Sequence, residues 1–160
     1  MNIFVLDKDP ATAAQYHTDS HVVKMILESA QMMSTTVRLS GVETDIAYKI
    51  AHKNHPCTIW TRQSLTNWRW LGSLAHYLNE EYKYRFGHIK NHKSYDVISK
   101  LPWPDIPDIG LTYFAQAMPD IYRIEKDSVQ SYRNYYLNEK KHLFKWTKRS
   151  QPFWIENSNI

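Results

Sequence analysis

One stretch of the sequence decides the fold: YHTDSHVVKMILESAQMMSTTVRL, residues 16–39. Asp19 or Ser20 can cap a helix here, because a short side-chain oxygen accepts hydrogen bonds from the free N–H groups of the first turn. No Gly or Pro follows until Gly41, a residue that suits the position just past a helix end. The stretch therefore predicts one long helix.

The two sides of this helix differ in character. Apolar residues recur at helical spacing on one side, which predicts a buried face: Val22, Val23, Ile26, Leu27, Ala30, Met33 and Val37. Six polar residues step by three and four along the other side and form one row: His21, Lys24, Glu28, Gln31, Thr35 and Arg38. Such a row is typical of a cleft, where buried polar groups need hydrogen bonds. The alternative is a solvated face with a Lys24–Glu28 ion pair.

Length and composition narrow the class of protein. A chain of 160 residues forms one domain, residues 1–160, that buries about 70% of its unfolded surface. Cys57 is the single cysteine, which excludes an internal disulfide and fits a reducing cytoplasm. No apolar run approaches the length of a membrane span, and the first residues lack the pattern of a signal peptide. We therefore expect no membrane partner.

Helix start and stop signals predict five to seven helices, packed as a single compact, mostly α-helical domain. Besides the central helix, they cover about residues 10–16, 43–53, 56–62, 65–86, 95–99 and 128–137. The predicted caps include Asp9, Thr44, Ser94 and Asp127. Ile3 to Leu6 precede the helices as a short extended segment. Gly72, on the buried side of its helix, predicts a close helix crossing.

Residues 101–108 predict an ordered loop. Pro102, Pro104 and Pro107 exclude a regular helix and remove hydrogen-bond donors from any strand. Long loops of this kind are often functional. Residues 110–119 are too apolar for a free linker, so we expect them to cover part of the core or of the cleft.

A nucleic-acid partner is indicated by the C-terminal part of the chain. Residues 121–149 contain eight Lys or Arg residues against three acidic ones, and the whole chain carries a formal charge of +4. Aromatic residues, 14% of the chain, often stand beside these cations, a mixture that suits base stacking and phosphate contact. The same mixture is equally typical of a core in which buried Tyr and Trp side chains hydrogen-bond through their O–H and N–H groups. The predicted nucleic-acid contacts are Arg133, Lys145, Trp146, Lys148 and Arg149.

Two other chemistries are weaker. His17 and His21, four residues apart, and His52 and His55, three apart, have spacings that can bind a metal ion, but no Glu or Asp motif of a metallohydrolase accompanies them. A metal cofactor is therefore not favoured. Cys57 stands near a helix start, where a thiol pKa falls, yet lone cysteines are most often buried structure.

Several motifs resemble a family of small, poorly characterised proteins of tailed bacteriophages. They are YHxDxHVVKMILExAQ at residues 16–31, HKNHPxxIWxR at 52–62, AMPD at 117–120 and YRNYY at 132–136. Together they cover most of the chain. The resemblance implies a phage origin and action in the cytoplasm of the infected host cell, and it supplies no catalytic residues.

The favoured functional prediction is an enzyme that acts on nucleic acid, at base or backbone, or on nucleotides, through the polar row. His21, Lys24 and Glu28 are its predicted catalytic residues, because carboxylate and imidazole groups transfer protons. The predicted substrate contacts are Gln31, Thr35, Arg38, His52, His55, Trp60 and Arg62. One alternative is a non-catalytic module that binds nucleic acid or a host protein. Another is a metal-dependent hydrolase using His17, His21, His52 and His55.

Overall fold

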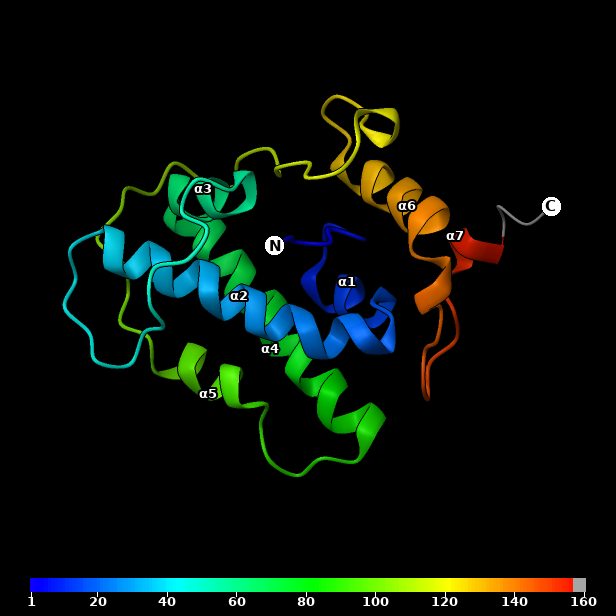
Figure 1. Ribbon diagram of the computed structural model, residues 1–160, viewed down its shortest axis with the longest axis horizontal. Helices are drawn as coiled ribbons and strands as arrows, with labels where there is room; N and C mark the ends of the chain where they lie inside the picture. Colours follow the sequence, from blue (N-terminus) through cyan, green and yellow to red (C-terminus); the bar gives the residue numbers. More distant parts are fainter. Residues whose placement is uncertain (157–160) are drawn as a thin grey trace.

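Two long helices form the centre of the computed structural model, which describes residues 1–156 (Figure 1). They are α2 (Asp19–Leu39) and α4 (Leu65–Phe86), and they pack along one another. Helix α1 (Pro10–Tyr16) packs on α4, whereas α3 (Pro56–Gln63) and α5 (Lys93–Lys100) contact both.

The rest of the chain forms a smaller group of elements around α6 (Ser128–Glu139). These are the short 3-10 helices η1 (Asp120–Tyr122) and η2 (Lys141–Leu143) and the short helix α7 (Phe153–Glu156). In Figure 1, α6 lies on one side of the α2–α4 pair and α5 on the other. The central pair therefore separates two different faces of the molecule.

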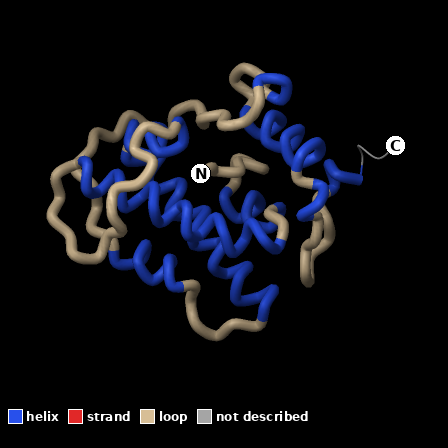
Figure 2. Tube along the Cα trace, in the orientation of Figure 1, coloured by secondary structure: helices blue, strands red, loops and turns tan. Residues whose placement is uncertain are grey.

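Residues 1–156 form helices and loops and contain no strand (Figure 2). The N-terminal segment is not helical, and Ile3 to Leu6 are buried within it. The prediction of a single, mostly α-helical domain with a short N-terminal extended segment is confirmed. Residues 157–160 of the predicted domain lie outside the described part. No helix within that part has the length and hydrophobicity needed to cross a membrane.

Most predicted helix ends are confirmed. Asp9 caps α1 by accepting a hydrogen bond from the N–H of Thr12 at 3.1 Å, and Asp127 caps α6 in the same way. Gly87 ends α4 with φ of 69°, a left-handed conformation that favours glycine. A Cβ on Gly72 would lie 3.1 Å from Cε of Met33, so the predicted close crossing of α4 and α2 is also found.

Two predicted caps are wrong. Helix α2 begins after Thr18, and the carboxylate of Asp19 binds Arg85 and Thr147 instead of capping its own helix. Helix α5 is capped by Nδ1 of His92, which accepts a hydrogen bond from the N–H of Ser94.

The predicted helix at residues 43–53 is wrong, because this segment is an irregular loop. Its backbone carbonyls are hydrogen-bonded to α2 and α3 rather than to its own N–H groups. Arg38 donates to the carbonyls of Ala47 and Tyr48, and Thr35 pairs with both backbone groups of Ala51. The segment therefore satisfies these backbone groups through side chains of its neighbours and without a helix of its own.

The buried face of α2 is broader than the apolar pattern predicts. Val22, Ile26, Ala30, Met33 and Val37 are buried as expected, but Val23 and Leu27 are about 40% exposed. Met25 and Met32, which flank the polar row, are buried instead. Compared with the prediction, the buried face of α2 is therefore shifted around the helix toward the polar row.

Candidate functional site

Most of the polar row on α2 is covered by other parts of the chain, so the alternative of a solvated face is wrong. His21, Glu28 and Thr35 are buried, and Gln31 and Arg38 are partly buried. Only the side chain of Lys24 is largely exposed, at 68%. The row meets two different partners, a pocket at its N-terminal half and the 43–55 loop at its C-terminal half.

A small pocket adjoins the N-terminal half of the row. It contains all three predicted catalytic residues, His21, Lys24 and Glu28. Met25 of α2 also lines it, and the N-terminal segment and the end of α6 complete the lining with Met1, Asn2, Phe4, Tyr135 and Lys140. Its cavity volume of about 130 Å³ is below the range of sites that enclose a whole organic ligand, so it has room for one small group.

His21 is held in this pocket by rings on two sides. Phe4 stacks on its imidazole with centroids 4.4 Å apart, and Nδ1 lies 2.6 Å from the hydroxyl oxygen of Tyr136. That oxygen also accepts a hydrogen bond from the N–H of Thr18, so the hydroxyl proton of Tyr136 is free to point at Nδ1. We assign the hydroxyl of Tyr136 as the donor to Nδ1, which leaves the proton of the neutral imidazole on Nε2.

Glu28 is the single carboxylate among the residues that line the pocket. Its Oε1 accepts a hydrogen bond from the N–H of Asn2 at 2.8 Å and lies 3.3 Å from the Met1 amine. Its Oε2 lies 3.9 Å from Nζ of Lys24. The carboxylate therefore also holds the N-terminal segment against α2.

Cations outnumber the carboxylate in this pocket. The Met1 amine, Lys24 and Lys140 line it together with Glu28. Nζ of Lys140 is positioned by two rings, 4.9 Å from the centroid of Tyr135 and 6.0 Å from that of Phe4. The pocket therefore carries a surplus of positive charge, which attracts an anion.

The pKa of His21 is lowered to about 3. Burial is the main cause, because it disfavours the charged imidazolium, and the neighbouring charges of His17, Lys140, Lys24 and His142 act in the same direction. At neutral pH the imidazole is thus uncharged, and its Nε2–H is a hydrogen-bond donor rather than a cation.

The C-terminal half of the row has a structural role. The side chains of Thr35 and Arg38, predicted to bind substrate, bind the backbone of the 43–55 loop instead. Arg62, another predicted substrate contact, donates to the carbonyl of Lys53 at the end of the same loop. The side chain of Gln31 forms no hydrogen bond within residues 1–156, and the residue is half-buried.

His52, His55 and Trp60 are not part of the pocket lining. His52 is exposed, with φ of 49°, and His55 caps α3 by accepting from the N–H of Cys57. The pKa of His55 is lowered, mainly by burial and further by the charge of the Met1 amine. Trp60 is buried, stacks on Phe114 and serves the core.

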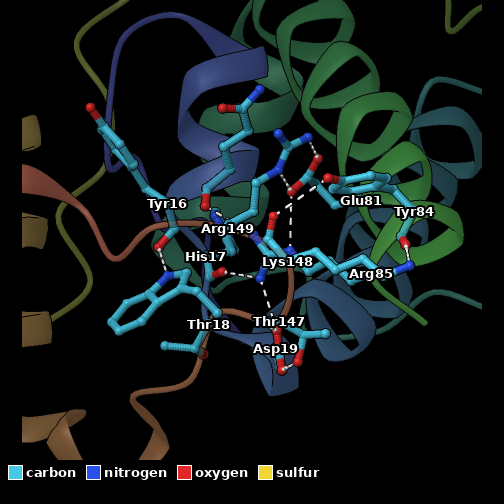
Figure 3. A network of polar contacts seen from close by, with 12 residues as sticks. Tyr16, His17, Thr18, Asp19, Glu81, Tyr84, Arg85, Thr147, Lys148 and Arg149 are labelled. Atoms are coloured by element: carbon cyan, nitrogen blue, oxygen red, sulfur yellow. Dashed lines mark hydrogen bonds and ion pairs between the residues drawn. The ribbon is translucent and has the colours of Figure 1, made fainter.

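Four of the five predicted nucleic-acid contacts, Arg133, Trp146, Lys148 and Arg149, have side chains bound within the protein. Arg149 pairs with both carboxylate oxygens of Glu81, and Trp146 donates from its indole to the carbonyl of Tyr16 (Figure 3). Arg133 binds the carbonyl of Leu6 and lies over the rings of α7. Sequence patterns cannot distinguish such cations from free ones.

Lys145 and Lys148 are the two exposed members of that set. Nζ of Lys148 donates to the carbonyl of Tyr84, and the carbonyl of Lys145 accepts from the N–H of Asp19. The structure therefore does not gather the five residues into one basic surface.

The four histidines of the metal alternative are not brought together. His17 is fully buried, and its Nδ1 lies 2.6 Å from the carbonyl of Ala13. The described residues contain no group of three or more side chains placed to hold a metal ion. Cys57 is buried too, and burial raises the pKa of its thiol to about 11, which opposes the thiolate form.

Sequence reasoning missed Phe4, Tyr135 and Lys140, which complete the pocket. They lie far from α2 in the sequence, so no spacing pattern connects them with the polar row. The one sequence feature that could have pointed to Phe4 is the apolar run Ile3 to Leu6, because an apolar segment outside a helix has to pack against the rest of the fold.

The fold and this pocket define the chain as a small helical protein with a cation-rich polar pocket. Comparison with models of protein families, with curated proteins and with solved structures found no match. The resemblance to a phage family therefore stays a prediction, as does the function drawn from the polar row.

Proposed function

We propose that the protein is an enzyme that binds a phosphate group of a nucleotide or nucleic acid in the pocket of His21, Lys24, Glu28 and Lys140. One observation carries this proposal: the three predicted catalytic residues line a single pocket, and the fold adds a cation from the end of α6 to them. The volume of about 130 Å³ suits a phosphate rather than a whole nucleotide, so the rest of the substrate lies outside.

The chemistry follows from the charges. Lys24, Lys140 and Nε2–H of His21 provide donors for the phosphate oxygens and stabilise negative charge that develops on them. Glu28 is the proton acceptor for water or for a substrate hydroxyl. Hydrolysis of a phosphate ester fits this arrangement, because water attacks phosphorus, the P–O bond to the leaving group breaks, and Glu28 takes the water proton.

The resemblance to a tailed-phage family implies a place of action, the infected cell, but no activity. We propose that the protein acts on nucleotides or nucleic acid in the cytoplasm of an infected host cell. The surplus of positive charge in the pocket favours this partner over an uncharged one.

Incubation with nucleotides and with short single- and double-stranded oligonucleotides tests the proposal, with products detected by mass spectrometry. Glu28→Gln is expected to lower the rate by about 100-fold or more, because general acid–base catalysis contributes 10²–10⁴. Glu80→Gln, an exposed carboxylate on α4, is the matched control. The new amide in Glu28→Gln retains an oxygen for the N–H of Asn2, and thermal melting verifies that the variant folds.

The same assay distinguishes the proposed enzyme from the alternative, a binding module without catalytic activity. Phosphate or oligonucleotide binding without turnover, equally strong in wild type and Glu28→Gln, would identify a binding module. Turnover unchanged in Glu28→Gln would contradict the catalytic role of this carboxylate.

A further inference from the structure

A second concave site lies between α4, α5 and the proline-rich loop that follows α5. Its cavity volume of about 350 Å³ is in the range of small-molecule sites. Rings make up much of its lining: Trp68, His76, Tyr77, Tyr95 and Trp103. Its lining comes from α4, α5, the following loop and Met33 of α2, and shares no residue with the phosphate pocket. Helices α5 and α6 lie on opposite sides of the α2–α4 pair (Figure 1). We call it the Trp103 groove.

Trp103 gives this groove an exposed indole ring. Its side chain is 59% exposed, whereas Trp68 beneath it is 5% exposed and lies at a centroid distance of 6.3 Å. A large exposed indole is unusual on a protein surface, because burial of aromatic area is favourable. Here it is available for a ligand ring.

The loop that carries Trp103 is anchored on both sides. The N–H of Asp105 donates to Oγ of Ser40 at 3.1 Å. Asp108 accepts from the N–H and the hydroxyl of Thr66 at the start of α4, and these bonds lower its pKa to about 2. Since the loop is already ordered, a ligand that stacks on Trp103 loses little affinity to loop ordering.

Arg69 is the charged side chain in the lining of this groove, which contains no acidic residue. Its guanidinium carbon lies 5.3 Å from the centroid of the Trp103 ring. It is exposed and forms no ion pair within residues 1–156. The guanidinium thus lies over the exposed indole without an ion-pair partner among the described residues, and it can bind an anion attached to a planar ring.

We infer that the Trp103 groove binds a purine or pyrimidine ring that carries a phosphate, with the ring stacked on Trp103 and the phosphate at Arg69. This chemistry is shared by free mononucleotides and by single-stranded nucleic acid. The inference uses none of the pocket residues and does not depend on the proposed reaction.

Nuclear magnetic resonance of the full-length protein tests it through the indole N–H of Trp103, assigned by its absence in Trp103→Phe. Adenosine monophosphate is the first probe, with adenosine and inorganic phosphate for comparison. The expected result is a saturable shift with adenosine monophosphate and binding at least about fivefold weaker for either comparison probe. This site-specific signal separates the groove from the phosphate pocket.

Variants assign the two contacts. Trp103→Ala, made together with Lys140→Met to weaken the phosphate pocket, is followed by calorimetry. Compared with Lys140→Met alone, it is expected to weaken adenosine monophosphate binding about fivefold or more, as loss of base stacking does. Tyr113→Ala, which removes another highly exposed ring outside the groove, leaves affinity unchanged. Arg69→Met is expected to reduce binding of adenosine monophosphate to that of adenosine, whereas Lys140→Met in the phosphate pocket leaves the Trp103 shift intact.

An oligonucleotide distinguishes the two possible ligands, a free mononucleotide and single-stranded nucleic acid. Tighter binding of single-stranded oligodeoxythymidine than of the mononucleotide, with steep salt dependence, would indicate a polynucleotide. The reverse order would indicate a free nucleotide. No shift of Trp103 with any probe, or affinity unchanged in Trp103→Ala, would overturn the inference.

Discussion

His17 and His21 show how burial sets the chemistry of single residues in this protein. The pKa of His17 is lowered to about 4, mainly by burial, and that of His21 to about 3. Both rings are therefore neutral at physiological pH, and neither is a cationic acid. In the proposed site, positive charge comes from lysines and His21 contributes a donor.

The two lowered pKa values predict how stability depends on pH. A buried histidine takes up its proton at a lower pH in the folded state than in the unfolded chain, where the ordinary pKa is 6.5. The unfolded state therefore binds more protons between these values, so stability is greatest above pH 6.5 and falls as the pH decreases toward 4. For His17 alone the loss is about 3 kcal/mol.

Urea unfolding of His17→Gln between pH 7 and 4.5 measures this dependence. We expect the slope of the unfolding free energy against pH to flatten in this variant, whatever its absolute stability. His88→Gln, which removes an exposed histidine that does not contribute to the lowered pKa of His17 or His21, keeps the wild-type slope. An equal slope in His17→Gln would show that this ring does not titrate on unfolding.

At the scale of elements, the 43–55 loop depends on side chains from its neighbours. Arg38→Met removes two hydrogen bonds to the carbonyls of Ala47 and Tyr48, one of them 2.7 Å long. Bonds from a charged donor contribute about 1.5–3 kcal/mol, so we expect a loss of that size. Hydrogen exchange is expected to accelerate within residues 43–55, where the carbonyl anchors lie.

The matched control is Arg123→Met, which removes an exposed arginine paired with Asp120. Its stability is expected to change by less than about 1 kcal/mol. Unchanged exchange protection of the loop in Arg38→Met would contradict the anchoring role.

The same loop shows where sequence patterns succeed and fail. Helices whose ends are marked by local signals, such as Asp9 with Pro10 or Gly87, are predictable because those residues act on their own backbone. Residues 43–53 have a similar start signal in Thr44, which binds the N–H groups of Ile46 and Ala47. Arg38 overrides it from another helix, and no local pattern contains that information.

At the scale of the whole molecule, a buried ionic cluster joins distant parts of the chain. Glu81 on α4 accepts from Nε of Arg85 and from Arg149 in the C-terminal segment, while Arg85 also binds Asp19 and the carbonyl of His17 (Figure 3). Glu81 and Arg85 are both at least 95% buried. The cluster thus fixes the start of α2 and the C-terminal segment to one end of α4.

Glu81→Gln is expected to destabilise the protein by about 3 kcal/mol or more, because it leaves the buried charge of Arg85 with a weaker partner. Glu80→Gln next to it, where the carboxylate is half-exposed and pairs with Lys83, is expected to cost less than about 1 kcal/mol. Urea unfolding of the two variants compares them directly. Equal small effects would mean that the cluster contributes little to stability.

The candidate site was predictable only where its residues belong to one helix. His21, Lys24 and Glu28 lie on one helix, so their spacing predicts a shared surface. Lys140 enters the pocket only through the packing of α6 and Phe4, which depends on contacts between distant segments. The reverse holds for Arg149, whose basic character indicates a free cation although Glu81 binds it.

The central claim is that the pocket of His21, Lys24, Glu28 and Lys140 binds a phosphate group. Titration of the isotope-labelled protein with inorganic phosphate, followed at the ring of His21 and the amide of Asn2, tests it most directly. We predict saturable shifts at both, about tenfold weaker binding in Lys140→Met, and unchanged binding in Lys141→Met, which alters an exposed neighbour. No shift at His21, or equal affinity in Lys140→Met, would contradict the claim.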